Sequence, residues 1–112
     1  MNKFYAKKKV IDGISFDSLK ESMHYMVLKQ AQQDGKIRDL IVHPTFQITW
    51  PLGVKICKVE LDFMYYDIIQ DKTCYIDVKG WDKKKKKWRV TNESRIKKLL
   101  VEAQYKIKVE YA

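Results

Sequence analysis

The sequence predicts one mixed α/β domain, a sheet flanked by helices, with its elements in the order helix, three strands, helix, strand. Two segments carry apolar residues at helical spacing, and the segments between and after them alternate apolar and polar residues as strands do. The 112 residues suit a single domain over 1–112, with 1–15 as a basic N-terminal arm or strand. Because 46% of the residues are hydrophobic, the chain can build a core.

The first helix is predicted to begin after Ser18 and to end near Asp34. Glu21 stands three residues after Ser18, which is capping-box spacing, and Gly35 suits the left-handed residue that follows a helix. We expect the helix to be covered on more than one side, with Glu21 on a partly buried row. One row along the helix is apolar and consists of Leu19, Met23, Met26 and Val27. A second row consists of Glu21, Tyr25 and Leu28.

Three strands are predicted next. The first covers residues 37–50 and closes at the turn 51–53, and the second covers residues 55–68. In the second strand Asp62 is expected on the face opposite Val59, Leu61, Phe63 and Tyr65. The third strand follows a turn at 70–72, forms a hairpin with the second and ends at Gly80, with Cys74, Ile76 and Val78 toward the core.

A second helix and a last strand complete the domain. Thr91 or Asn92 is expected to cap a helix that runs to about Gln104, with an apolar face made of Ile96, Leu99, Leu100 and Ala103. Residues 106–111 alternate as a strand.

Charge is concentrated in one segment. Of the formal net charge of +9, residues 79–98 carry ten basic side chains against Asp82 and Glu93, a net +8. The lysine run, Lys83, Lys84, Lys85, Lys86 and Lys87, lies between Trp81 and Trp88 and is followed by Arg89, and a second basic cluster is Lys7, Lys8 and Lys9. Lysines beside aromatic rings favour nucleic acid as the partner, although a solvated lysine loop remains an alternative.

Hydropathy and the cysteine spacing argue against a membrane-spanning protein and against a zinc site. No apolar run approaches the roughly 20 residues that cross a bilayer, so we expect a soluble cytoplasmic protein without a membrane partner. Cys57 and Cys74 lack the spacing of zinc ligands and are expected to be buried thiols. A domain of this size buries a limited share of its surface, so a dimer is plausible.

Acidic residues in three of these elements are candidates for chemistry. Asp77 and Lys79 share one face of the third strand, and the hairpin brings Asp62 close to the level of Asp77. Carboxylates suit a hard cation such as Mg²⁺, which would activate an attacking water, and Lys79 would position that water or offset phosphate charge. Glu21 could join the acidic set directly or through water. The alternatives are a surface ion pair for Asp77 and Lys79, and a capping box for Glu21.

The sequence resembles the PD-(D/E)XK nuclease superfamily, and within it a group of small, mostly phage-encoded proteins. The resemblance lies in three blocks: residues 10–21, which end in Glu21, residues 59–63 around Asp62, and residues 75–80 around Asp77 and Lys79. Leu61 stands where the superfamily name has proline, and Asp77 where glutamate is commoner.

The resemblance implies a restriction-endonuclease-like αβββαβ core. It implies that Asp62, Asp77 and the backbone carbonyl of Val78 bind Mg²⁺ or Mn²⁺ and that Lys79 and Glu21 are catalytic. It also implies a homodimeric DNA endonuclease encoded by a phage and acting in the bacterial host cell. Small members resemble Holliday junction resolvases of the phage T7 type, which suggests branched DNA as the substrate. The alternatives are a non-catalytic nucleic-acid-binding or inhibitory phage protein with this fold, and a module that binds an acidic protein.

Overall fold

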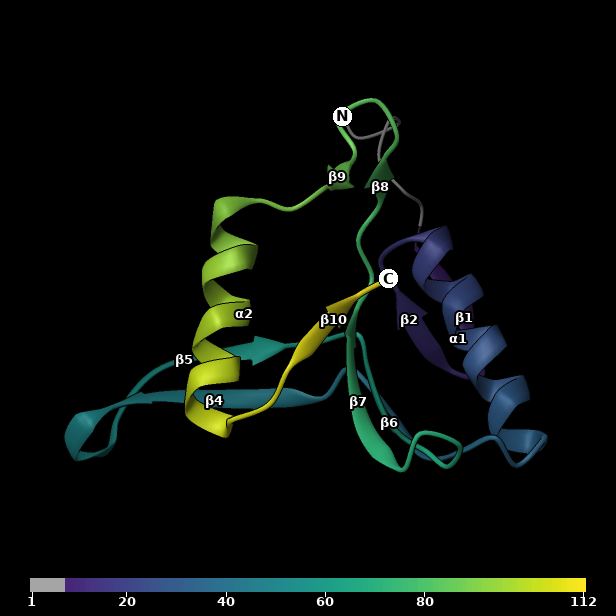
Figure 1. The fold of residues 1–112 in the computed structure, drawn as a ribbon, viewed down its shortest axis with the longest axis horizontal. Helices are drawn as coiled ribbons and strands as arrows, with labels where there is room; N and C mark the ends of the chain where they lie inside the picture. Colours follow the sequence, from purple (N-terminus) through teal and green to yellow (C-terminus); the bar gives the residue numbers. More distant parts are fainter. Residues whose placement is uncertain (1–7) are drawn as a thin grey trace.

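The computed structural model describes residues 8–112, so Lys7 of the basic arm lies outside the described residues. A mixed four-stranded sheet has the order β10 (Val109–Tyr111), β7 (Lys72–Asp77), β6 (Phe63–Asp67) and β3 (Ile37–Val42). β6 is antiparallel to both β3 and β7, and β10 runs parallel to β7. The helices α1 (Leu19–Gln33) and α2 (Asn92–Tyr105) lie on either side (Figure 1). A mixed sheet with two helices is therefore confirmed.

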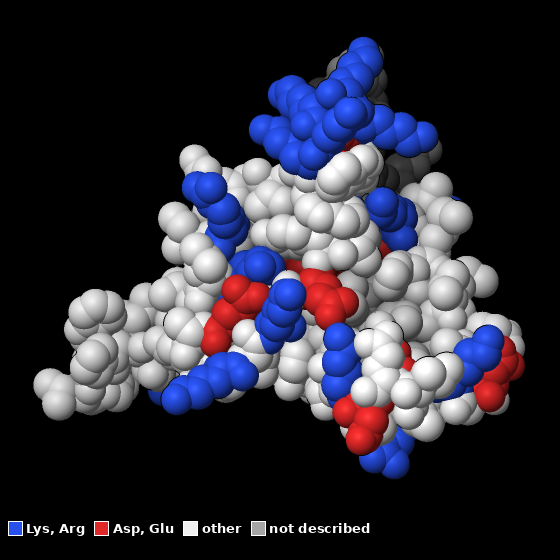
Figure 2. All heavy atoms as spheres, in the orientation of Figure 1, with Lys and Arg blue, Asp and Glu red and all other residues white. Residues whose placement is uncertain are grey.

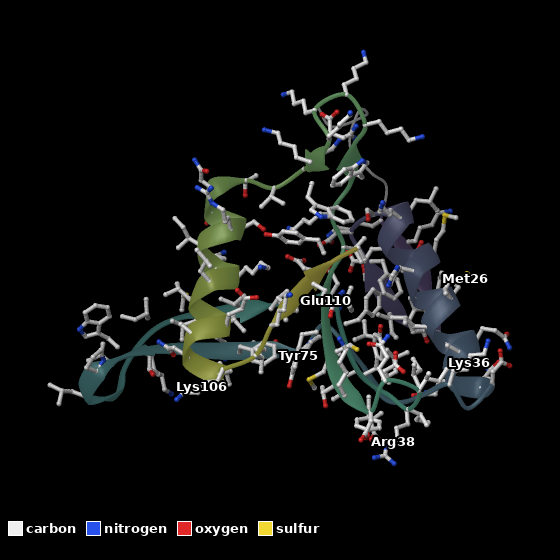
Figure 3. All side chains as sticks on the ribbon, viewed as in Figure 1. Met26, Lys36, Arg38, Tyr75, Lys106 and Glu110 are labelled. Atoms are coloured by element: carbon white, nitrogen blue, oxygen red, sulfur yellow. The ribbon has the colours of Figure 1, made fainter. Side chains whose placement is uncertain are left out.

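Helix α1 begins and ends as predicted. The Ser18 hydroxyl accepts a hydrogen bond from the Glu21 N–H at 3.1 Å, and Gly35 follows the helix with a φ of 76°. Tyr25 and Leu28 are buried, but the other apolar row is exposed, and Met26 points away from the sheet (Figure 3). The expectation of cover on more than one side is wrong, because α1 packs only through the row that contains Glu21.

Residues 9–16 form a hairpin, in agreement with the strand alternative for the N-terminal segment. β1 (Lys9–Ile11) and β2 (Ile14–Phe16) pair across Asp12 and Gly13, which both have positive φ as a tight hairpin turn requires. Phe16 is fully buried, and the Asp12 carboxylate accepts a hydrogen bond from the Tyr25 hydroxyl at 2.7 Å. The hairpin is thereby tied to α1.

The predicted first and second strands are each divided in two. β3 gives way to β4 (Thr45–Trp50), and β5 (Val54–Glu60) gives way to β6. The breaks lie opposite each other, because Val42 pairs with Phe63 and Thr45 with Glu60. We call residues 43–44 and 61–62 the corner. Pro44 cannot donate to a ladder, which explains why regular pairing stops here.

The corner separates two cores. Phe63 joins Phe16, Tyr25 and Ile76 in a core under α1, with further members Leu28, Ile37 and Cys74. Val59 and Leu61 join a second core under α2, together with Ile48, Val101 and Val109. The prediction that Val59, Leu61, Phe63 and Tyr65 share one face is wrong, because the chain passes from one core to the other at Asp62.

The strands β4 and β5 form a ribbon that projects from the central sheet (Figure 1). Its tip is the short 3₁₀ turn η1 (Pro51–Gly53), where Leu52 is fully exposed with a φ of 75°. Cys57 on this ribbon is only half-buried, whereas Cys74 is buried and its burial raises the pKa of the thiol. Burial of both thiols was predicted, and it holds for Cys74.

Beyond β7 the chain forms the lysine hairpin, β8 (Trp81–Asp82) and β9 (Lys87–Trp88), and then α2, capped by Thr91. The predicted apolar face of α2 is wrong in part, since Ile96 and Leu99 are exposed and Val101 is the fully buried residue. The helix rests on the second core through Val101.

Within residues 8–112, neither helix combines the length and apolarity needed to span a membrane.

Candidate metal centre

Backbone hydrogen bonds at the corner fix the position of Asp62. The Leu61 N–H donates to the carbonyl of Pro44 at 2.9 Å, and the Asp62 N–H donates to the carbonyl of Ile76 at 3.1 Å. The His43 N–H donates to the Asp62 carbonyl at 3.0 Å, and His43 has a φ of 57°. Left-handed backbone is uncommon outside glycine, but histidine is among the residues that tolerate it. The corner therefore holds His43 and Asp62 side by side.

The Asp62 side chain faces the end of β7. Its Oδ2 accepts a hydrogen bond from the Val78 N–H at 2.6 Å, and a further hydrogen bond joins the Asp62 and Asp77 carboxyls. Burial, the bond to Asp77 and the charges of Glu21 and Asp77 raise the pKa of Asp62 to about 8, against the opposing effect of the Val78 N–H. Without a cation, Asp62 therefore holds a proton at neutral pH.

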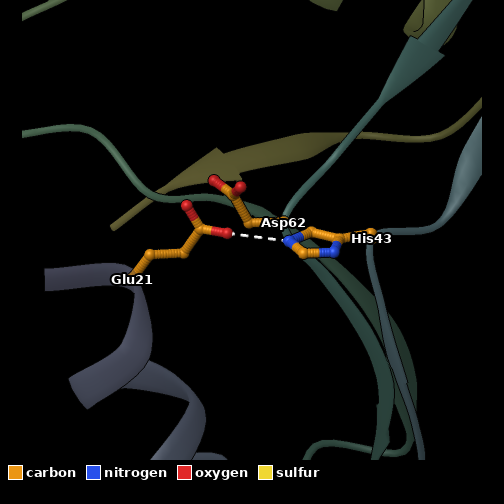
Figure 4. Close-up of side chains that lie close together, drawn as sticks. All are labelled: Glu21, His43 and Asp62. Atoms are coloured by element: carbon orange, nitrogen blue, oxygen red, sulfur yellow. Dashed lines mark hydrogen bonds and ion pairs between the residues drawn. The ribbon is translucent and has the colours of Figure 1, made fainter. Parts of the chain in front are cut away.

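Glu21 reaches the same cluster from α1. Its carboxylate lies 2.9 Å from Nε2 of His43, and the residue is 7% exposed (Figure 4). Ser18 caps the Glu21 N–H, but the Glu21 side chain is turned to His43. The capping-box alternative thus describes the Glu21 backbone and not its carboxylate. One potential ligand atom from each of Glu21, His43 and Asp62 lies within 4.8 Å of the others.

Lys79 completes the cluster on the far side of Asp77. Its Nζ lies 3.4 Å from Oδ2 of Asp77, and both side chains are largely buried. The Lys79 N–H donates to the Ala112 carbonyl, and the Ala112 N–H donates to the Asp77 carbonyl, at 2.8 and 3.1 Å. These two bonds extend the β7–β10 pairing past the last strand residue and hold Asp77 and Lys79 in place.

All four residues predicted to be catalytic are therefore brought together: Glu21, Asp62, Asp77 and Lys79. Val78 contributes its N–H to Asp62, and a metal-binding role for its carbonyl stays a prediction. His43 was missed, because a lone histidine between two apolar segments gives no motif. The available signal was Pro44, which marks a strand break where a polar neighbour can turn inward.

The donor set fits a hard divalent cation. Two carboxyl groups and one imidazole, those of Glu21, Asp62 and His43, each place one ligand atom within 4.8 Å of the others, and the Asp77 carboxyl lies beside Asp62. Carboxylate oxygens are the ligands that Mg²⁺ and Mn²⁺ prefer. A cation there would replace the proton on Asp62 and remove the repulsion between the carboxylates. These side chains are therefore chemically suited to a hard divalent cation.

The lysine hairpin extends directly from this cluster. Lys83 to Lys87 are exposed, and Figure 2 shows basic side chains concentrated on the hairpin at the top of the view. The rings of Trp81 and Trp88 pack edge to face, with centroids 5.1 Å apart. This contact between the two rings stabilises the lysine hairpin. Arg89 is exposed beyond them, as are Lys8 and Lys9 at the N-terminal hairpin.

Among known proteins, the chain is similar to one protein family. No curated protein and no solved structure matches the chain. A family model matches residues 1–111, nearly the whole chain, and carries the description "Protein of unknown function (DUF1064)". The chain therefore belongs to the DUF1064 family.

Proposed function

We propose that this protein is a metal-dependent endonuclease that hydrolyses phosphodiester bonds in DNA. The observation that supports the proposal is that acidic side chains from separate parts of the chain lie close together beside a lysine. Glu21 of α1 and Asp62 of the corner lie close together, Asp77 of β7 interacts with Asp62, and Lys79 pairs with Asp77 at 3.4 Å, at the base of a strongly basic hairpin. A protein that only binds DNA gains nothing from buried acids beside a phosphate, because they repel it.

The topology supports the same proposal. Apart from the two small hairpins and the projecting ribbon, the elements follow the order α1, β3, β6, β7, α2 and β10, with β10 parallel to β7. This order is similar to the restriction-endonuclease-like αβββαβ core.

The chain supplies the ligands and the positioning groups of this reaction. Asp62 and Asp77 would hold Mg²⁺ or Mn²⁺, with Glu21 bound directly or through water. The bound cation supplies a Lewis acid and a water of lowered pKa. His43 fixes the orientation of Glu21 through the 2.9 Å contact, and Lys79 stands where its ammonium can face phosphate or water.

Lys79→Ala provides the decisive variant. We expect cleavage to fall by about a hundredfold or more while fold and DNA affinity stay nearly intact, because its charge matters chiefly in the transition state. Lys72→Ala is the matched control, because Lys72 begins β7 at the end remote from Lys79 and pairs with Glu110 at 3.3 Å, outside the cluster. Equal cleavage by wild type and Lys79→Ala would exclude this cluster as the active site.

The assay uses labelled linear, single-stranded and four-way-junction DNA with Mg²⁺, Mn²⁺ or EDTA. The resemblance to junction resolvases leads us to expect that the four-way junction is cleaved in preference to the other two DNA substrates. It also leads us to expect that the enzyme acts in the bacterial host cell of a phage.

Symmetrical cutting of a junction needs two active sites related by a two-fold axis, so we expect a homodimer in light scattering. Binding without cleavage in every metal would instead favour the non-catalytic DNA-binding alternative.

A further inference from the structure

A cavity of about 580 Å³ lies between the lysine hairpin and the start of α2. The basic side chains that line it come from three places: Lys85 and Lys87 from the hairpin, Arg89 from the segment after it, and Arg95 from the second turn of α2. We call these four residues the cationic pocket. Its volume is within the range of about 300 to 1,000 Å³ that small ligands occupy.

The charges of the cationic pocket are not neutralised within the described chain. None of its four side chains forms an ion pair with an acid among residues 8–112. Asp82 also lines the cavity, but its Oδ1 accepts from the N–H groups of Lys84 and Lys85. Arg95 donates one hydrogen bond to Asn92 at 3.1 Å, which leaves the rest of its guanidinium available. Four cationic side chains without acidic partners around one cavity are suited to binding a negatively charged phosphate group.

Gly80 fixes Arg89 beside the acid cluster. A Cβ built on Gly80 would lie 3.3 Å from Cδ of Arg89, so the arginine side chain lies directly across this glycine. The Arg89 N–H also donates to the Gly80 carbonyl at 2.7 Å. Gly80 follows Lys79 in sequence, so Arg89 of the cationic pocket packs against the residue next to the cluster.

A smaller cavity lies between the acid cluster and α2. It has a volume of about 190 Å³ and is lined by Asp77 and Lys79 together with Ser94, Lys97 and Lys98 of α2. Ser94 and Arg95 are neighbours in sequence, so the first turns of α2 border the acid cluster on one side and the cationic pocket on the other. A strand lying along α2 would meet both.

We propose that the cationic pocket binds a backbone phosphate of the DNA strand that is cut, next to the phosphate held at the acid cluster. This proposal rests on the proposed function and deepens it by naming a second contact on the substrate. Arg95, which lies outside the lysine run, is its distinguishing residue, because its planar guanidinium can bind a phosphate through two hydrogen bonds.

The test is a binding measurement in EDTA, so that it does not depend on metal or cleavage. Arg95→Gln is compared with Arg38→Gln, an exposed arginine at the opposite end of the molecule from the lysine hairpin (Figure 3). For a single-stranded oligonucleotide we expect Arg95→Gln to bind about tenfold more weakly. Its log–log salt slope should fall by about 0.7. Arg38→Gln should match wild type, and equal loss in both variants would overturn the proposal.

A second arm distinguishes a DNA phosphate from a free one. Inorganic phosphate and pyrophosphate are titrated while the side-chain N–H resonance of Arg95 is followed by NMR, and the oligonucleotide is then titrated in the same way. We expect a saturable shift with all three and at least tenfold tighter binding of the oligonucleotide. Tighter binding of pyrophosphate than of the oligonucleotide, or no shift with any of them, would overturn the proposal. Absence of nuclease activity would leave these binding results unaffected.

Discussion

Replacing Asp62 by asparagine should make the metal-free protein more stable at neutral pH. Asparagine has nearly the same shape, its carbonyl can accept the Val78 N–H, and its amide can donate to Asp77. The substitution therefore removes a titrating carboxyl from the cluster while keeping its hydrogen bonds. What it loses is the charge that a cation needs.

The magnitude follows from the pKa of Asp62, which folding raises from 3.8 to about 8. Between these values the folded protein holds a proton on Asp62 that the unfolded chain releases, so this group lowers the free energy of unfolding as pH rises. The slope is about 1.4 kcal/mol per pH unit for one proton. Asp62→Asn lacks this dependence. The two proteins should be similar near pH 4, and between pH 5 and pH 7.5 the stability of the variant relative to wild type should rise by about 3 kcal/mol.

Urea unfolding in EDTA, followed by tryptophan fluorescence from pH 5 to 8, measures this difference. Adding Mn²⁺ at pH 8 should then stabilise wild type by mass action and leave Asp62→Asn unchanged. Parallel stability curves for the two proteins would refute the argument, because they would mean that Asp62 is already ionised in the folded protein at neutral pH.

Three further predictions test other parts of the structure. His43→Ala should weaken Mn²⁺ binding by about 10- to 100-fold in a thermal-shift titration at pH 7.5, since it removes the partner that orients Glu21, whereas His24→Ala should leave it unchanged. Replacing Lys83 to Lys87 by serine should lower the log–log salt slope of duplex DNA binding by about 0.9 per lost phosphate contact. An unchanged slope would mean that the lysine run is a solvated loop that does not contact phosphates. Leu61→Ala should cost about 2 to 5 kcal/mol in urea unfolding because Leu61 is 2% exposed, while Leu52→Ala at the exposed ribbon tip should cost less than about 0.5 kcal/mol, and equal losses would contradict the assignment of Leu61 to the core.

Local signals predicted the parts of the fold that local interactions form. Ser18 and Gly35 mark the ends of α1 because a cap and a left-handed residue act within one turn. The hairpin of β6 and β7 followed from alternation on both sides of a polar turn, and it brought Asp62 and Asp77 together as expected.

The corner could not be predicted from alternation. Val59, Leu61 and Phe63 are apolar at every second position, and this pattern is the same whether the chain stays in one sheet or passes from one core to another. For the same reason the contact of His43 with Glu21 was missed, since it depends on how the corner turns a single side chain. Which row of α1 is buried was also open, because tertiary packing selected the row with Glu21 over a more apolar one.

The projecting ribbon gives this protein a natural attachment point for a reporter. Backbone bonds at the corner anchor the base of the ribbon, whereas Leu52 at its tip is fully exposed and held in left-handed backbone that glycine or asparagine adopts more readily. A fluorophore on a cysteine placed at Leu52, or a short peptide inserted beside Gly53, would extend into solvent without changing the register at Asp62. Distances from such a probe to a labelled oligonucleotide would then give the direction in which a bound strand crosses the domain.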